Sequence, residues 1–337
     1  MKLVLVLCCL GPLGALAAVY EPLELNYHER VGIPLAQALK QAELAADFDG
    51  GRIIGGSFAA LGAYPYKAGQ IMTLTNGGQS IGGGTLISNT RVLTAAHNLI
   101  SGGQLVRHVT VVLGSVRIFS GGTRITSNRM DIHANYNPNN INNDIAIITI
   151  DWVNYSNTIR NIGLASGSNT YAGAWAWAIG FGKTSDTEPA SPDLKHVRVQ
   201  VISNDACRSA IPGNFVIAST LCISGTTGNI CTGDSGGPLV ADNLLVSYFT
   251  SIHYPIKITN TFVSKEIHKR SDKRRKEVIN MRPNHQSRFS LDGIKGKKTI
   301  MKSLIGVSSF GSGLCDARRP SGFARVSSFN SWIRARL

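Results

Sequence analysis

The sequence has little charge, few cysteines and almost no long apolar run. Of its 337 residues, 16% are charged, 43% are hydrophobic and 36 are glycine, which suits a turn-rich globular β protein better than a coiled coil or a disordered chain. Beyond the N-terminal residues, no stretch approaches the roughly 20 apolar residues that a membrane span needs. There is no C-x-x-C pair, no metal-like clustering of histidines and no cofactor motif. We therefore expect no metal, no cofactor and no membrane partner.

Positive charge is abundant overall but unevenly distributed. The net charge is +14, which by itself suggests a nucleic-acid ligand. Residues 246–302 contain fourteen Lys and Arg against four Asp and Glu, a net of +10, so the basicity belongs to one segment. The most basic part of that segment lacks aromatic stacking motifs, which argues against nucleic-acid recognition.

The N-terminal sequence MKLVLVLCCLGPLGALA is typical of a secretory signal peptide, with one lysine, an apolar run and small residues around Ala15–Ala17. A membrane anchor is the alternative, but the run is short for a span. We expect residues 1–17 to be removed, together with Cys8 and Cys9. The four remaining cysteines form an even number in a secreted chain, which predicts disulfides.

Residues 18–52 differ from the rest of the chain. IPLAQALKQAELAADF (33–48) places apolar residues at helical spacing. DGGRIIGG (49–56) then combines four glycines with Arg52, a tryptic type of cleavage site. We interpret 18–52 as an activation propeptide, with an ordinary N-terminal helix and loop as the alternative.

From Ile53 the sequence indicates β structure. Short alternating or β-branched runs such as HVTVVLGSVRIF, DIAIITI and HVRVQVIS are separated by Gly, Asn and Ser turns, which predicts an all-β sandwich or barrel. The C-terminal FNSWIRARL (329–337) has the features of a closing helix, with Asn330 or Ser331 near its N-cap.

The basic segment 246–302 does not follow this pattern. Deleting it joins GGPLVADNLL to SLIGVSSFG, two apolar strands around an Asp242-Asn243 turn, which is a good hairpin. Three interpretations compete: a basic exosite for anionic partners, an inert loop, or translated intron. We favour the third, because removing the segment restores a clean hairpin and Val246-Ser247 can be encoded by a splice-donor type of sequence.

The stretch CTGDSGGPLV (231–240) presents Ser235 between glycines. A serine nucleophile needs a base, an acid that orients the base, and N–H donors for the oxyanion. Glycines allow the unusual backbone angles that turn amides inward. His97 follows a small-residue pair in LTAAHN, and Asp144 opens the apolar strand of NNDIAIITI. The order His97, Asp144, Ser235 is one of the known triad orders.

These motifs resemble those of the chymotrypsin-like serine proteases. Five motifs occur in the order typical of that family over about residues 53–337: RIIGG, TAAHN, DIAII, WAIGFG and CTGDSGGPL. Within the family, the sequence most resembles insect digestive chymotrypsins and collagenase-like proteases. The resemblance implies two six-stranded antiparallel β-barrels, at about 53–158 and 159–337, followed by a C-terminal helix. It also implies that His97 is the general base, Asp144 its partner and Ser235 the nucleophile, with the N–H groups of Gly233 and Ser235 as oxyanion hole.

Activation and specificity are implied by the same resemblance. Cleavage after Arg52 would free the amino group of Ile53 to pair with Asp234. The remaining implied positions are the pocket base at Asn229, the pocket walls at Gly311 and Ser321, and the substrate-pairing strand at Ser309, Phe310 and Gly311. Because Asn229 is uncharged, we expect a preference for large apolar or aromatic side chains.

The resemblance also pairs Cys207 with Cys222 and Cys231 with Cys315. The family usually has a further disulfide beside the catalytic histidine, and here its two positions are Gly82 and Asn98. Losing a native disulfide typically costs about 2–5 kcal/mol, so local rigidity under His97 is in question.

We therefore expect a secreted serine endopeptidase made as a zymogen, with the gut lumen as one candidate location. Its partners would be protein or peptide substrates and a trypsin-like activating protease, and we expect a monomer. A non-catalytic protease homologue that acts by binding is the first alternative, and a polyanion-binding protein that uses residues 246–302 is the second.

Overall fold

The computed structural model describes residues 25–49, 57–183, 185–187, 192–243, 301–311, 314–315 and 317–337. The expected signal peptide, the expected cleavage site at Arg52-Ile53 and residues 246–300 of the basic segment lie outside these ranges. The chain divides into two contact units, Met1–Asn243 with Lys302–Leu337, and Leu244–Met301.

The first sheet holds the strands that carry His97 and Asp144. Its order is β5-β6-β2-β3-β4-β9-β8, with β7 paired to β6, and all the pairs are antiparallel. The sheet is a curled half-barrel rather than a closed one, because no pairing joins its two ends in the described residues. The strands are β2 (Lys67–Leu74), β3 (Gln79–Ser88), β4 (Arg91–Thr94), β5 (Ile100–Ser101), β6 (Gln104–Leu113), β7 (Thr123–Ser127), β8 (Met130–Ile132) and β9 (Ala146–Thr149).

The second sheet closes on itself as a six-stranded barrel. Its strands follow the order β12-β11-β14-β15-β16-β13, and β13 pairs back to β12. Two short strands are added outside this ring: β1 pairs with β12, and β10 pairs in parallel with β15. The strands are β1 (Ser57–Phe58), β10 (Gly163–Leu164), β11 (Trp175–Gly180), β12 (Lys195–Ile202), β13 (Thr220–Ile223), β14 (Pro238–Asn243), β15 (Met301–Phe310) and β16 (Ser321–Arg325).

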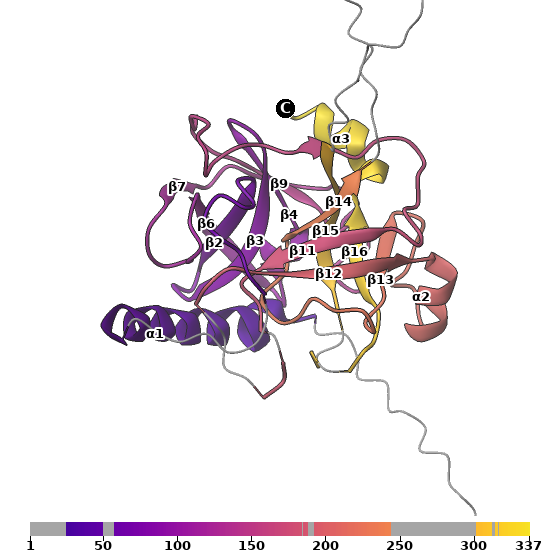
Figure 1. Cartoon of the computed structure of the whole chain (residues 1–337), viewed down its shortest axis with the longest axis horizontal. Helices are drawn as coiled ribbons and strands as arrows, with labels where there is room; N and C mark the ends of the chain where they lie inside the picture. The colour runs from indigo at the N-terminus through magenta and orange to yellow at the C-terminus, as the bar shows by residue number, and fades with distance from the viewer. Residues whose placement is uncertain are drawn as a thin grey trace, which may run out of the picture. The chain divides into compact units, whose positions relative to one another are not determined.

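The architecture confirms the all-β expectation with a C-terminal helix (Figure 1). One difference concerns β1, which begins the expected first barrel but pairs with β12 of the second. The strands on either side of the basic segment, β14 and β15, are hydrogen-bonded neighbours. The pairing that the sequence predicted for these two strands is therefore present.

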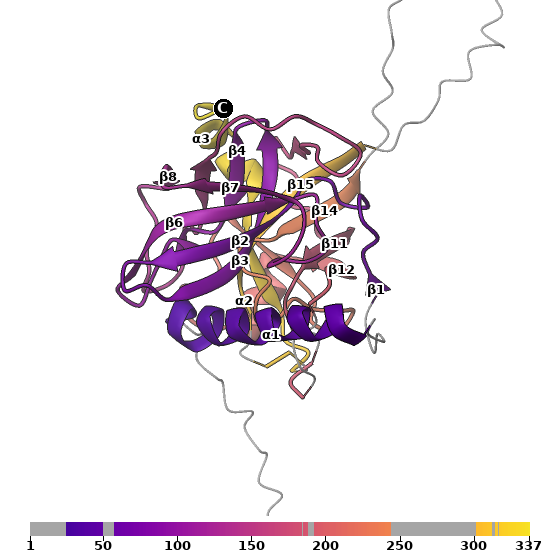
Figure 2. The same cartoon turned by 90° about the vertical axis from the view of Figure 1, so that its left-hand side faces the viewer.

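The helices are few and mostly short. They are η1 (His28–Gly32), α1 (Ile33–Asp49), η2 (Ala96–Asn98), α2 (Asn204–Ala210), η3 (Val326–Phe329) and α3 (Asn330–Arg334). α1 confirms the helix expected at 33–48, and the π-helix η1 before it was not expected. α1 runs across one side of the β structure (Figure 2) and contacts β3. Among the described residues, no helix is long and apolar enough to cross a membrane.

α1 is held through one apolar stripe. Leu35, Ala36 and Leu39 are at most 3% exposed and belong to the largest cluster of buried side chains in the molecule. Their i, i+1 and i+4 spacing places them on one face, as an amphipathic helix requires. Each buried leucine contributes about 1.5–3 kcal/mol. The N-terminal segment is therefore part of the core of the uncleaved chain.

Candidate active site

His97 and Asp144 are brought together by neighbouring strands. His97 lies in η2, directly after β4, and Asp144 precedes β9, the antiparallel partner of β4. One carboxylate oxygen of Asp144 accepts from the backbone N–H of His97 at 2.8 Å, and the other lies 2.7 Å from His97 Nδ1. Because a carboxylate accepts hydrogen bonds, this arrangement places the proton on Nδ1 and leaves Nε2 as a base.

Asp144 has a third partner that the sequence did not reveal. Ser309 on β15 donates from Oγ to Asp144 Oδ2 at 2.6 Å, and Asp144 is 1% exposed. A buried carboxylate requires such donors, since an unpaired one is strongly unfavourable. Ser309 thus holds the acid that orients the imidazole, in addition to its expected place on the substrate-pairing strand.

Two glycines near Ser235 adopt backbone angles that other residues rarely adopt. Gly233 has φ +102° and Gly236 has φ +76°, both in the region that favours glycine. A Cβ on Gly236 would also lie 2.4 Å from Asn98 Nδ2 and from Gly83 O. Among the described residues, the N–H groups of Gly233 and Ser235 donate no backbone hydrogen bond.

Asn98 takes the place of the missing disulfide. A Cβ on Gly82 would be 2.6 Å from Asn98 Nδ2, so the asparagine side chain fills the space that a second cysteine would need. Asn98 Nδ2 donates to the carbonyl oxygen of Ser235 at 3.0 Å and to Thr94 Oγ1 at 3.2 Å. The same carbonyl accepts from Gly83 N at 2.7 Å. Asn98 therefore connects the histidine turn directly to the backbone of the nucleophile.

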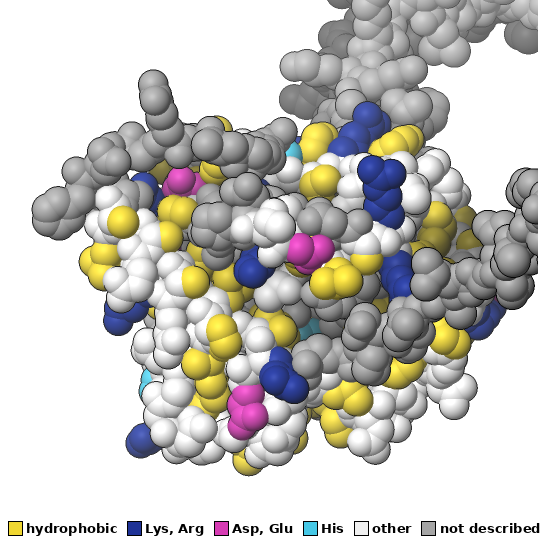
Figure 3. Space-filling view, turned by 90° about the horizontal axis from the view of Figure 1, so that it is seen from below, with side chains coloured by type: hydrophobic (Ala, Val, Ile, Leu, Met, Phe, Trp, Pro, Cys, Tyr) yellow, Lys and Arg dark blue, Asp and Glu magenta, His cyan; other side chains and the backbone are white. Residues whose placement is uncertain are grey.

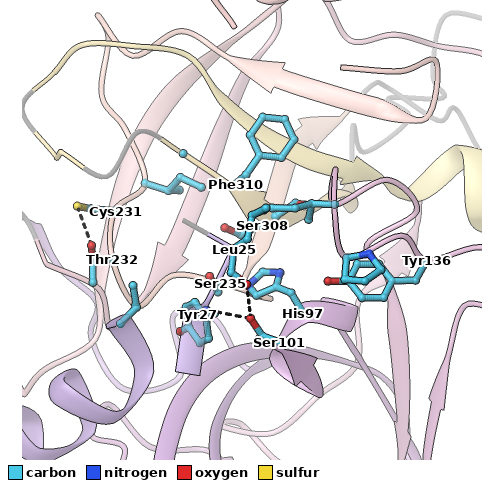
Figure 4. Close-up of a pocket in the computed structure, with 16 residues that line it drawn as sticks. Leu25, Tyr27, His97, Ser101, Tyr136, Cys231, Thr232, Ser235, Ser308 and Phe310 are labelled. Atoms are coloured by element: carbon cyan, nitrogen blue, oxygen red, sulfur yellow. Dashed lines mark hydrogen bonds between the residues drawn. The ribbon is translucent and has the colours of Figure 1, made fainter. Parts of the chain in front are cut away.

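His97 and Ser235 line one cavity, and residues of the N-terminal segment form part of its wall. The cavity measures about 80 Å³ and is also lined by Leu25, Tyr27 and Val31. Figure 4 shows the side chains of His97, Ser235 and Tyr27 next to one another. The Tyr27 ring meets the His97 ring edge-on, with centroids 5.0 Å apart. Burial raises the pKa of Tyr27, and a hydrogen bond with the Ser235 side chain opposes that effect.

Asp234 lines a second, larger cavity of about 800 Å³. Its carboxylate accepts from Gly182 N at 2.9 Å and Cys231 N at 3.0 Å. Burial raises the pKa of Asp234, and these two bonds and the charge of Lys67 oppose the rise. Burial lowers the pKa of Lys67 to about 8. Asp234 therefore lies in a setting where an additional ammonium group would be stabilised.

The residues expected in the specificity pocket also gather together. Asn229 Oδ1 accepts from Ser321 Oγ at 2.7 Å, and its Nδ2 donates to Arg319 O at 3.0 Å. A Cβ on Gly311 would lie 2.9 Å from the same Ser321 hydroxyl. Asn229 lines the larger cavity with Asp234, whereas Gly311, Ser309 and Phe310 line the cavity of Ser235.

Both expected disulfides are formed, Cys207–Cys222 and Cys231–Cys315. The second ties the turn before Ser235 to the segment that follows β15. Arg52 and Ile53 lie outside the described residues. Sequence reasoning missed Tyr27 and the link from Asn98 to Ser235. Only the unusual asparagine after the histidine signalled the second of these, and nothing in the sequence signalled the first.

The fold and the site together define a serine protease of the two-barrel kind. A sequence model described as Trypsin matches residues 53–263, and the chain belongs to this family. The resemblance noted from the motifs is thereby confirmed.

Individual relatives agree with this assignment. A collagenase of Hypoderma lineatum is 32% identical over 289 residues, covering 84% of this chain and 86% of the relative. Trypsin delta of Drosophila melanogaster is 36% identical over 200 residues, covering 58% and 76% respectively. The solved structure of HL collagenase superimposes with a TM-score of 0.62 at 31% identity, covering 84% of this chain and 98% of that one.

Proposed function

We propose that the protein is a secreted serine endopeptidase made as an inactive precursor, with His97, Asp144 and Ser235 as its catalytic triad. The observation that carries the proposal is the bonding of Asp144 to both the backbone and Nδ1 of His97, in the cavity that also contains Ser235. The tautomer that results is the one in which Nε2 can accept a proton from the serine hydroxyl.

The chemistry follows the route established for this family. Ser235 Oγ attacks the scissile carbonyl carbon while His97 Nε2 takes its proton, and the N–H groups of Gly233 and Ser235 stabilise the oxyanion. His97 then protonates the leaving amine, which leaves an acyl group on Ser235. Water, deprotonated by the same imidazole, hydrolyses that ester and restores the hydroxyl.

Activation would follow cleavage after Arg52. The freed ammonium of Ile53 would enter the cavity beside Asp234, where the buried carboxylate lacks a close cationic hydrogen-bond partner among the described contacts. Pairing there would fix the turn that contains Gly233. A trypsin-like protease is the expected activator, because the bond to be cut follows an arginine.

For specificity we propose large apolar or aromatic side chains, with Leu or Gln also accepted. Asn229 carries no charge, and its amide is already bonded to Ser321 and Arg319. It therefore offers a basic substrate side chain no counter-ion. The relative named collagenase makes a fibrous protein substrate a second candidate. Peptides varied at the residue before the cut would separate these possibilities.

The decisive test of catalysis is labelling by a fluorophosphonate after tryptic cleavage. Labelling at Ser235 and loss of peptide hydrolysis by about 10⁴–10⁶-fold in Ser235→Ala are expected. An intact, correctly cleaved protein that is neither labelled nor active would favour the non-catalytic homologue instead.

A further inference from the structure

The N-terminal segment makes contacts with the reacting groups themselves. Tyr27 is 6% exposed, and its hydroxyl donates to Ile81 O at 2.8 Å. Tyr27 also lines the cavity that contains Ser235, and its ring lies edge-on to the His97 ring, with centroids 5.0 Å apart. The Tyr27 ring therefore occupies space beside the nucleophile and the base that a substrate needs.

The backbone around Tyr27 is fixed to the first sheet. Ser101 Oγ accepts from Tyr27 N at 2.9 Å and donates to Leu25 O at 2.8 Å. The neighbouring His28 is fully buried, and its Nδ1 lies 3.0 Å from Ser80 Oγ on β3. The backbone groups of Leu25 and Tyr27 and the His28 Nδ1 atom therefore have partners on the first sheet, whereas His28 Nε2 is buried without a hydrogen-bond partner among the described residues.

α1 continues the contact toward the oxyanion donors. A Cβ on Gly233 would lie 2.2 Å from Leu35 Cδ2, so the leucine packs directly on the glycine whose N–H we assign to the oxyanion hole. Leu39, one turn further along the helix, is 0% exposed. The helix thus packs on the turn that precedes Ser235, whereas Tyr27, which precedes the helix, contacts the histidine.

Further along α1, the buried carboxylate of Glu43 is hydrogen-bonded by residues 118–120. Glu43 Oε1 accepts from Ile118 N at 2.8 Å and from Phe119 N at 2.9 Å, and Oε2 accepts from Ser120 Oγ at 2.8 Å. Glu43 is 3% exposed. Hydrogen bonds to an ionised carboxylate are stronger than neutral ones, and burying a carboxylate without them is very unfavourable. This contact selects one position of the helix.

We propose that residues 25–49 are an inhibitor of the chain's own active site that stays bound after cleavage at Arg52, so that dissociation of the segment is a second step of activation. The proposal rests on the proposed function, since it assigns the segment to the site that we identify as catalytic. The contacts that carry it lie at Tyr27, at the apolar stripe of α1 and at Glu43. None of them involves the cleavage site itself.

The experiment uses the full chain with residues 48–52 replaced by an enteropeptidase site, so that Arg30 and Lys40 in the segment are not cut. After cleavage, native mass spectrometry and gel filtration report whether the segment remains associated. Hydrolysis of a small ester is followed in parallel at several protein dilutions. A second series carries Ser235→Ala, so that association is measured without self-digestion.

Matched variants of the segment locate the contact. Leu39→Ala should weaken association at least tenfold, whereas Leu44→Ala, the same change at a position 56% exposed on the same helix, should not. Glu43→Ala should weaken it about a hundredfold, and Glu43→Gln about tenfold, because one amide oxygen still accepts from the loop. Tyr27→Ala should give ester hydrolysis without delay.

The expected result is a cleaved complex whose activity appears only on dilution. Immediate loss of the segment from the cleaved chain, with Leu39→Ala and Leu44→Ala alike, would overturn the proposal while leaving protease activity intact. A cleaved protein that remains inactive even after the segment is washed out would instead count against the proposed function. The two failures are therefore distinguishable.

Discussion

The barrel that carries Ser235 is cross-linked by two disulfides, whereas no cysteine occurs between residues 10 and 206, which include the whole sheet of His97 and Asp144. The first sheet is held by side-chain hydrogen bonds, such as those of Asn98, and by the N-terminal segment that packs on β3. In the view from below, apolar, basic and acidic side chains are interspersed among the described residues, and no patch of one charge covers this face (Figure 3).

This difference has a consequence for activation. Disulfides remain in place when the chain is cut, but the packing of α1 is lost once the segment leaves. We therefore expect the first sheet to be the half whose stability changes on activation, and the second barrel to be the half that stays constant.

The largest effect should come from removing the disulfide that closes the longer loop. Cys231 and Cys315 are 84 residues apart, and Cys207 and Cys222 are 15 apart. If a disulfide stabilises by reducing the entropy of the unfolded chain, closing these loops adds about 4.6 and about 3 kcal/mol, respectively, to the free energy of unfolding. The double change Cys231→Ser with Cys315→Ser should lower the free energy of unfolding more than Cys207→Ser with Cys222→Ser, as measured in urea. Equal losses would show that the second barrel is not held in the way described.

The second-largest effect tests the half without disulfides. Gly82→Cys combined with Asn98→Cys would restore the bond usual in the family across a loop of similar length to Cys207–Cys222. We expect the free energy of unfolding to rise by about 3 kcal/mol, less the contribution of the Asn98 hydrogen bonds that the change removes. Unfolding in urea with and without a reductant measures it. A gain that persists under reduction would mean that the added bond is not its source.

The fold was largely readable from the sequence, because its signals are local. Alternating apolar and polar residues predicted the strands, and the helical spacing of apolar residues in 33–48 predicted α1. The order of the three motifs predicted that His97, Asp144 and Ser235 lie together. Those predictions succeed because each depends on neighbours in sequence or on a motif that fixes a turn.

The contacts of the N-terminal segment were not readable in this way. Glu43 is charged and lies within an apolar helix face, so periodicity alone does not reveal that a distant loop presents two N–H groups and a hydroxyl to it. Tyr27 precedes the helix and belongs to no periodic pattern. The roles of Tyr27 and Glu43 depend on tertiary hydrogen-bond partners more than fifty residues away in the sequence.

A smaller effect is expected from Asn98→Ala. The change removes the side-chain donor to the Ser235 carbonyl but keeps the donor from Gly83 N, so the carbonyl is still satisfied. We expect a loss of about 1–2 kcal/mol in unfolding free energy and about a tenfold fall in kcat with little change in KM. Asn98→Asp also removes the donor and places a buried carboxylate beside the Ser235 carbonyl, so it should cost more stability than Asn98→Ala. A normal kcat in both variants would show that the Gly83 bond alone positions the serine.

The smallest effect concerns pH and the segment on the first sheet. Burial, and secondarily the charge of His97, lower the pKa of His28 from 6.5 to about 4. The groups that face its ring are Ser80, the Tyr27 ring and His97. Because the docked imidazole resists protonation while the released one does not, docking is strongest above pH 6.5 and weakens as the pH falls toward 4. Between pH 7.5 and 5.5, the cleaved segment should bind about tenfold more weakly.

The comparison with His28→Asn isolates this contribution, since asparagine can still bond to Ser80 but does not titrate. The ratio of wild-type to variant affinity, measured by titrating labelled segment into the cleaved Ser235→Ala protein, should fall over the same pH interval. A constant ratio would mean that His28 is equally protonated in the docked and free segments, and that acid does not favour release through this residue.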